Sequence, residues 1–173
     1  MATLILHGIE NHRPPEHWQF QLAAHLARRG ERVLYPDLPD ADAPRLAVWE
    51  RRLRELLPGV DTVVCHSLAC LLWFHAAAGI TPVERLFLVA PPDSARVPEA
   101  GASFRLERFD ADAVRASARA LTLVGGDDDP YNPHGPALYA DPLGIEPRVL
   151  RGAGHITPAT GYGRWPEAEG WFA

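Results

Sequence analysis

The chain contains no lysine at all: its seventeen basic residues are all arginine, and its formal net charge is −5. The arginines form no basic run of the kind that binds a phosphate backbone, so we expect no nucleic-acid partner. A net negative charge of this size is typical of a protein kept in solution by its charge, and it does not indicate a specific function.

Cysteines and long apolar runs are also scarce. Cys65 and Cys70 are the only cysteines and cannot supply a disulfide framework, so we expect two buried thiols in a reducing compartment. No apolar run approaches the roughly 20 residues that cross a bilayer, and the run near the N-terminus is too short for a signal peptide. We therefore expect a cytoplasmic protein that does not enter a membrane.

Short apolar runs and helical periodicity alternate along the chain. The runs, each followed by a polar or Gly/Pro-rich loop, are residues 3–6, 32–35, 62–65, 85–90, 120–124 and 148–150. They lack polar alternation, which is typical of strands buried on both faces of a parallel sheet. Two helices are predicted from apolar residues that share one helical face: Trp18, Leu22 and Leu26 in the first, and Leu46, Trp49, Leu53 and Leu57 in the second. A third helix is predicted to begin at Leu68. A fourth is predicted over residues 111–119 with Asp110 as its N-cap, and a short last helix is predicted to begin at Pro166.

This alternation predicts a single α/β domain over residues 1–173, built on a doubly wound, mostly parallel sheet of about six strands. No internal repeat or linker divides the chain, and the longest predicted loop is residues 91–104. In such sheets ligands bind beyond the carboxyl ends of the strands, so the residues directly after each apolar run are the candidates for a site.

Ser67 is the first candidate. In the segment VVCHSLAC it follows a predicted strand and precedes a predicted helix, the context of a nucleophile elbow. The two flanking positions that are usually glycine hold Cys65 and Ala69. The alternative is that Ser67 is an ordinary N-cap of the helix.

A nucleophilic serine needs a base and an acid that orients the base. His155 follows the last predicted strand in the Gly-flanked loop RGAGHIT. The acid candidates are the consecutive residues Asp127, Asp128 and Asp129 after the fifth strand, with Asp93 after the fourth as a competitor. The chain order of serine, aspartate and histidine is that of α/β-hydrolases.

Two backbone amides are predicted to stabilise an oxyanion. Leu68 follows the serine at the start of a helix, where the helix dipole favours negative charge. Ile9 follows Gly8 in the loop after the first strand and is expected to supply the second N–H. His7, His12 and His17 with Asp37 lack the spacing of a helical metal motif, so we expect no metal and no cofactor.

Several segments together resemble the small α/β-hydrolases of the retinoblastoma-binding-protein-nine and YdeN-like type, nearly end to end. The segments are LHG with a later HW, YPDLP, HSLA, LVAPPD, DDDPY and GHITPATGYGRWPE. The resemblance implies a triad of Ser67, Asp129 and His155, which selects Asp129 among the three carboxylates. It also implies an α/β-hydrolase fold without a separate lid domain. Cys65 and Ala69 depart from the family's usual elbow.

These observations lead to the hypothesis of a serine hydrolase that cleaves carboxylic esters or related acyl groups of a small-molecule substrate. The alternative is a binding or scaffolding protein that keeps the hydrolase fold without turnover and acts through a protein partner. Covalent labelling of Ser67 would distinguish the two.

Overall fold

A computed structural model describes residues 2–172 and contains one six-stranded parallel sheet with the strand order β2-β1-β3-β4-β5-β6. Every neighbouring pair runs parallel. The strands are β1 (Ala2–Leu6), β2 (Arg32–Leu34), β3 (Thr62–His66), β4 (Val83–Val89), β5 (Ala118–Gly126) and β6 (Arg148–Leu150). Each corresponds to one predicted apolar run, which confirms the predicted α/β architecture with a parallel sheet of six strands.

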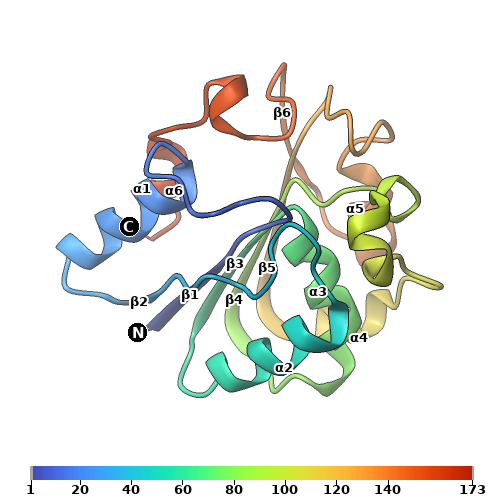
Figure 1. The fold of residues 1–173 in the computed structure, drawn as a ribbon, viewed down its shortest axis with the longest axis horizontal. Coiled ribbons are helices and arrows are strands. Elements are labelled where there is room, and N and C mark those ends of the chain that lie inside the picture. The colour runs from blue at the N-terminus through green and yellow to red at the C-terminus, as the bar shows by residue number, and fades with distance from the viewer. Residues whose placement is uncertain (1, 173) are drawn as a thin grey trace.

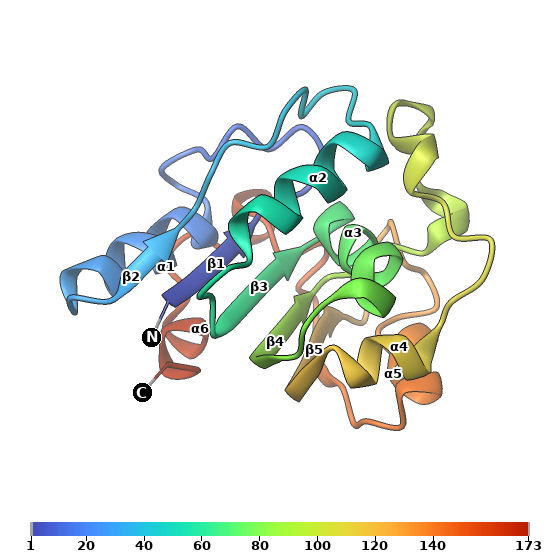
Figure 2. The ribbon, with the colours of Figure 1, turned by 90° about the horizontal axis from the view of Figure 1, so that it is seen from below.

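Helices cover both faces of the sheet (Figures 1 and 2). They are α1 (Trp18–Arg28), α2 (Leu46–Leu56), α3 (Leu68–Ala76), α4 (Ala111–Ala116), α5 (Ala137–Leu143) and α6 (Pro166–Gly170). Short 3-10 helices occupy Ala77–Gly79, Ser94–Arg96, Glu99–Phe104 and Pro158–Thr160. Helices α1 and α6 pack on one face, and α2 to α5 pack on the other. The residues described include no separate lid domain.

The core consists of two clusters, one on each face of the sheet. Leu4 and Leu6 of β1 point into the larger cluster beneath α2 to α5. Ile5, between them, joins the smaller cluster with Trp18 of α1 and Trp165. This division follows from the two-residue period of a strand, and all five residues of β1 are buried because helices cover both faces of the sheet.

Several predicted bounds differ from the structure, and β4 begins at Val83, two residues before the predicted run. The fourth helix ends at Ala116 instead of residue 119, because the Ser117 hydroxyl donates to the Val114 carbonyl and accepts from Trp73 Nε1–H. Ala118 then pairs with Val83, so β5 begins two residues earlier than expected. Helix α5 was not predicted, since Pro136 and Pro142 make its sequence resemble a turn.

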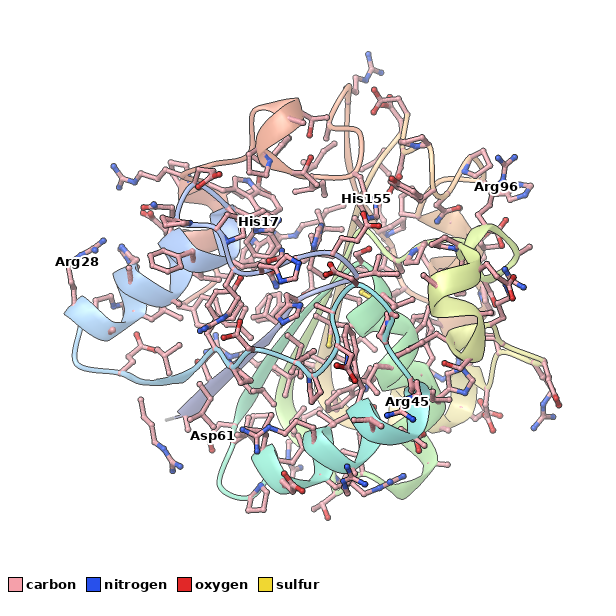
Figure 3. The ribbon with its side chains drawn as sticks, viewed as in Figure 1. His17, Arg28, Arg45, Asp61, Arg96 and His155 are labelled. Carbon is pink, nitrogen blue, oxygen red and sulfur yellow. The ribbon has the colours of Figure 1, made fainter. Side chains whose placement is uncertain are left out.

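The order in which successive strands join the sheet switches sides at β1: β2 pairs with one edge of β1 and β3 pairs with the other, while all strands stay parallel. Such a switch point opens a crevice at the carboxyl ends of the two strands. Figure 3 shows His17 and His155 near this edge, whereas Asp61 lies at the other end of β3. Between residues 2 and 172, no helix is both long and apolar enough to span a membrane.

Candidate active site

Ser67 lies in a sharp turn between β3 and α3. Its backbone has φ 57° and ψ −125°, a conformation that a non-glycine residue adopts at a cost of about 1–3 kcal/mol. Its N–H donates to the Val89 carbonyl, and its side chain makes no capping hydrogen bond to α3. The strand–turn–helix geometry predicted for Ser67 is therefore present, and its side chain does not cap the helix as the alternative requires.

The elbow forms with Cys65 and Ala69 in place of glycines. Both side chains are completely buried in the larger core cluster, and neither lines the cavity above Ser67. Burial raises the pKa of the Cys65 and Cys70 thiols, and neither cysteine forms a disulfide. Both cysteines are therefore buried core thiols, as expected.

Ser67, His155 and Asp129 form one hydrogen-bonded chain. The Ser67 hydroxyl donates to His155 Nε2 at 2.7 Å, and His155 Nδ1–H donates to Asp129 Oδ2 at 2.8 Å. Asp129 is only 3% exposed, and its second oxygen accepts the Tyr131 N–H at 2.9 Å. Because both carboxylate oxygens are held, the imidazole has a defined orientation and tautomer.

The three consecutive aspartates have three different partners. Asp127 accepts from the Gly152 N–H at 2.9 Å, and Asp128 accepts from the Gly154 N–H at 2.7 Å. These two carboxylates therefore fasten the loop that carries His155, while Asp129 contacts the imidazole itself. Asp93 instead accepts from the Ala95 N–H at the start of a 3-10 helix.

His66 connects the elbow to the histidine loop. Its Nε2–H donates to the His155 carbonyl oxygen at 3.0 Å, and its ring centroid lies 5.2 Å from that of His155. Burial lowers the pKa of His66 well below its ordinary value, so the ring is neutral. This contact had no specific signal in the sequence, because it joins residues 89 positions apart.

The predicted oxyanion donors lie on either side of Ser67. Ile9 and Leu68 both line the cavity, and within residues 2–172 neither backbone N–H donates to another group. Gly8 permits the close approach of the two loops: a Cβ there would lie 2.7 Å from Ser67 Cβ. A glycine is required at this position because any side chain would displace the serine.

The loop after β1 is anchored from several directions. His7 donates from Nδ1–H to the Gly8 carbonyl and accepts the Leu38 N–H on Nε2. The Arg13 guanidinium donates one hydrogen bond to each carboxylate oxygen of Asp37, and these hydrogen bonds lower the pKa of that carboxyl group. These contacts hold Ile9 in place beside the serine.

The histidines considered as metal ligands are not brought together. His7 uses both ring nitrogens inside the loop, and His12 bonds to Asp42 at the surface. His17 is the N-cap of α1, where it accepts the Gln19 N–H. Among residues 2–172, no group of three or more His, Cys, Asp or Glu side chains is placed to hold a metal ion.

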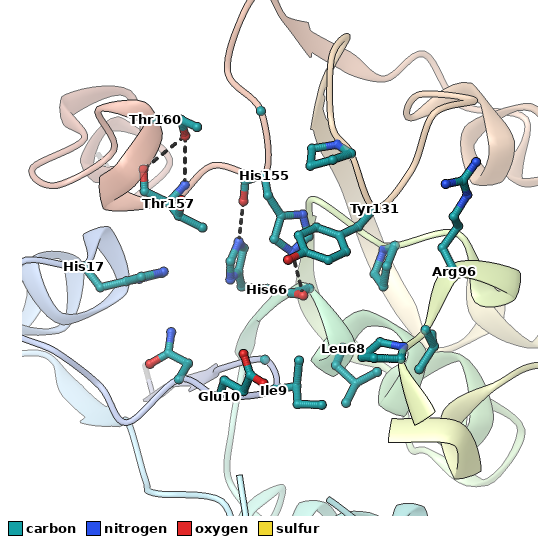
Figure 4. Close-up of a pocket in the computed structure, with 18 of the residues that line it drawn as sticks. Ile9, Glu10, His17, His66, Leu68, Arg96, Tyr131, His155, Thr157 and Thr160 are labelled. Atoms are coloured by element: carbon teal, nitrogen blue, oxygen red, sulfur yellow. Dashed lines mark hydrogen bonds between the residues drawn. The ribbon is translucent and has the colours of Figure 1, made fainter. Parts of the chain in front are cut away.

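A cavity of about 530 Å³ opens above Ser67 (Figure 4). This volume lies within the range of small-molecule sites. The loop after β4, whose relation to the site was open from the sequence, contributes Pro92, Arg96, Val97 and Pro98 to one wall. Tyr131 covers His155 with its ring centroid 4.6 Å away. The position of Tyr131 beside His155 was not predicted from the sequence. The position of His17 in the lining of the cavity was not predicted either.

Comparison with known proteins gives a family and a fold. The serine hydrolase family model matches residues 3–173. The ydeN gene product of B. subtilis is similar in structure, with a TM-score of 0.85, 18% identity and coverage of 99% of this chain and 96% of that one.

A putative YdeN-like hydrolase from Pectobacterium atrosepticum has a TM-score of 0.78 and 22% identity, covering 99% of this chain and 89% of that one. The esterase domain of a Rhodothermus marinus protein has a TM-score of 0.68 and 15% identity, with 98% and 84% coverage. At these identities the structural likenesses establish a shared fold. No curated protein sequence matches the chain significantly.

Proposed function

The chain belongs to the serine hydrolase family, and on that premise we propose that it hydrolyses carboxylic esters through an acyl-enzyme on Ser67. The observation that carries the proposal is the continuous hydrogen-bonded chain from Ser67 through His155 to Asp129. Distances of 2.7 and 2.8 Å are those of a serine positioned for deprotonation by a histidine that a carboxylate orients.

In the first half-reaction, Ser67 Oγ attacks the ester carbonyl carbon while its proton passes to His155 Nε2. The backbone N–H groups of Leu68 and Ile9 stabilise the negative oxygen of the tetrahedral intermediate. Asp129 stabilises the imidazolium through Nδ1–H and remains ionised. The intermediate then collapses: the bond to the alcohol oxygen breaks, and His155 gives that oxygen its proton.

In the second half-reaction, water attacks the acyl carbon and His155 takes its proton. The tetrahedral intermediate expels Ser67 Oγ, which regains the proton from His155. The carboxylic acid leaves, and the enzyme returns to its starting state. Each bond made and broken is accounted for without a cofactor.

The alternative of a binding protein without turnover is disfavoured by the strain at Ser67. A positive φ at a serine costs free energy, and here it directs the hydroxyl at His155 instead of at the end of α3. A binding protein that contacts its partner only through the surface of the fold has no need of this strained backbone conformation at Ser67.

Covalent labelling with a fluorophosphonate, followed by peptide mass mapping, tests the proposal. We expect label on Ser67 in the wild type and none in Ser67→Ala, while the exposed Ser103→Ala control is labelled like the wild type. Absence of label on folded wild-type protein, or label that persists in Ser67→Ala, would contradict the proposed nucleophile.

A further inference from the structure

The cavity above Ser67 has two sides of different chemistry. The side next to the loop after β4 is mainly apolar, with Arg96 as its one charged residue; the apolar residues are Ile9, Leu68, Pro92, Val97 and Pro98. The lining also includes Pro14 and a group of polar residues, which are Glu10, Asn11, His17, Thr157 and Thr160. Figure 4 shows His17 and Thr157 across the cavity from Leu68, with His155 between the two sides. A substrate bound at Ser67 therefore meets two different surfaces.

His17 presents an uncharged hydrogen-bond donor to the cavity. Its Nδ1 accepts the Gln19 N–H at 3.2 Å, which places the ring proton on Nε2. The residue is 4% exposed, and burial lowers its pKa to about 4, so the ring is neutral at physiological pH. Within residues 2–172 the Nε2–H has no hydrogen-bond acceptor, although the ring lines the cavity.

Asn11 and Thr157, which line the same cavity as His17, are also donors. Asn11 Oδ1 accepts the Arg13 N–H at 2.7 Å, which leaves its NH₂ group for another partner. The Thr157 hydroxyl oxygen accepts a backbone N–H in a capping box, which leaves its own hydrogen to donate. Together with His17 they form three uncharged donors, and Glu10 adds an exposed carboxylate that accepts hydrogen bonds.

The position of His155 indicates which part of the substrate meets this polar side. The alcohol oxygen receives its proton from His155 Nε2, so the alcohol lies toward the loop that carries this residue. Thr157 belongs to that same loop, and the His155 carbonyl is bonded to His66, which packs against His17 with ring centroids 5.2 Å apart. The acyl chain then extends toward Leu68 and Val97.

We infer that the preferred substrates are esters of an apolar acid with a polyhydroxylated alcohol, and that His17 is the specificity residue that donates to a hydroxyl of that alcohol. This inference rests on the proposed esterase function. A hydroxyl both accepts from the uncharged donors and donates to Glu10, whereas an alkyl alcohol offers no acceptor to the His17 N–H that faces the cavity.

A pair of esters with one acyl group and one carbon count tests the inference. Glyceryl 1-monobutyrate and propyl butyrate differ only in two hydroxyls on a three-carbon alcohol. We expect the wild type to favour the monobutyrate by about 10-fold or more in kcat/KM, the effect of one or two hydrogen bonds. His17→Asn should reduce this preference by about 10-fold, mainly through a higher KM for the monobutyrate, so that hydrolysis of the monobutyrate falls by more than hydrolysis of propyl butyrate.

His17→Asn retains the helix cap, because asparagine is among the best N-cap residues, while it removes the Nε2–H. His17→Ser serves as a second cap-retaining variant if the first does not fold. The matched control is His12→Asn, the same substitution in the same loop on an exposed side chain that does not line the cavity. It should leave the preference unchanged.

The outcomes separate this inference from the proposed function. Equal hydrolysis of the two esters by the wild type, or an equal loss on both in His17→Asn, would overturn the role of His17. Label on Ser67 without hydrolysis of the monobutyrate would overturn the substrate class and leave the nucleophile intact. If Ser67 takes no label and neither ester is cleaved, both proposals are wrong.

Discussion

His66 donates a hydrogen bond from Nε2–H to the backbone carbonyl of His155 at 3.0 Å. The residue before Ser67 is thereby joined to the loop that carries His155. This contact and the hydrogen bonds that Asp127 and Asp128 accept from the same loop fix the position of His155 relative to Ser67.

Loss of the His66 contact should reduce turnover. We expect His66→Leu to lower kcat by roughly 10- to 100-fold, because a small displacement of the His155 loop misaligns the proton transfer. His66→Gln, whose amide can still donate to the carbonyl, should recover part of the activity. Measurement of kcat and KM for both variants checks this, and equal losses in the two would show that packing alone is responsible.

Asp129→Asn tests the assignment of the acid. An amide at this position favours the wrong tautomer of His155, so kcat should fall by roughly 10³- to 10⁴-fold while the fold is retained. The controls are Asp128→Asn, whose side-chain oxygen can still accept the Gly154 N–H, and Asp93→Asn, whose side-chain oxygen can still cap the 3-10 helix. A comparable loss in Asp93→Asn would show that the wrong carboxylate has been assigned.

Gly8→Ala should disable the site through a steric clash. The added Cβ would lie 2.7 Å from Ser67 Cβ and 3.0 Å from Oγ, so the serine or the oxyanion loop must move. We expect roughly 100-fold lower kcat and about 1–3 kcal/mol lower free energy of unfolding. Gly79→Ala, where no atom lies within 4 Å of the new Cβ, should change neither quantity.

Stability should decline in acid because of His17. Its pKa is about 4 in the folded chain, against an ordinary value of 6.5, so between these values the unfolded chain binds a proton that the folded chain does not. The free energy of unfolding is therefore complete above pH 6.5 and falls as the pH decreases toward 4. For this residue alone the loss by pH 4 is on the order of 3 kcal/mol.

Urea unfolding at pH 7.5, 5 and 4 measures the effect of His17. His17→Asn removes the titrating group and keeps the cap, so its unfolding free energy should vary less with pH than that of the wild type. The buried residues His7 and His66 also have lowered pKa values and will leave some acid sensitivity. Identical pH profiles of the two proteins would exclude His17 as a contributor.

Much of the architecture was predictable from local pattern. The apolar runs predict all six strands, and β3 is typical: Val63, Val64 and Cys65 are consecutive apolar residues buried on both faces of the sheet. Helix α5 was not predicted because Pro136 and Pro142 make a helix unfavourable in the local sequence. The burial of Tyr139 and Leu143 in the core stabilises the helix despite these prolines. The end of α4 depended on Ser117, whose partner Trp73 is 44 residues away.

The sequence by itself determined the kind of site: a serine between an apolar strand and an apolar helix, followed by aspartates and a late histidine, each after a strand. From the residues alone the acid remained open among neighbouring carboxylates, and only the family resemblance favoured Asp129. The tertiary structure decided that Asp129 is the carboxylate hydrogen-bonded to His155. It also decided that His66 bonds to the His155 carbonyl, that Gly8 lies against Ser67, and that His17 lines the same cavity. These relationships join residues 26 to 89 positions apart, and such contacts depend on the register and twist of the whole sheet, which no local pattern encodes.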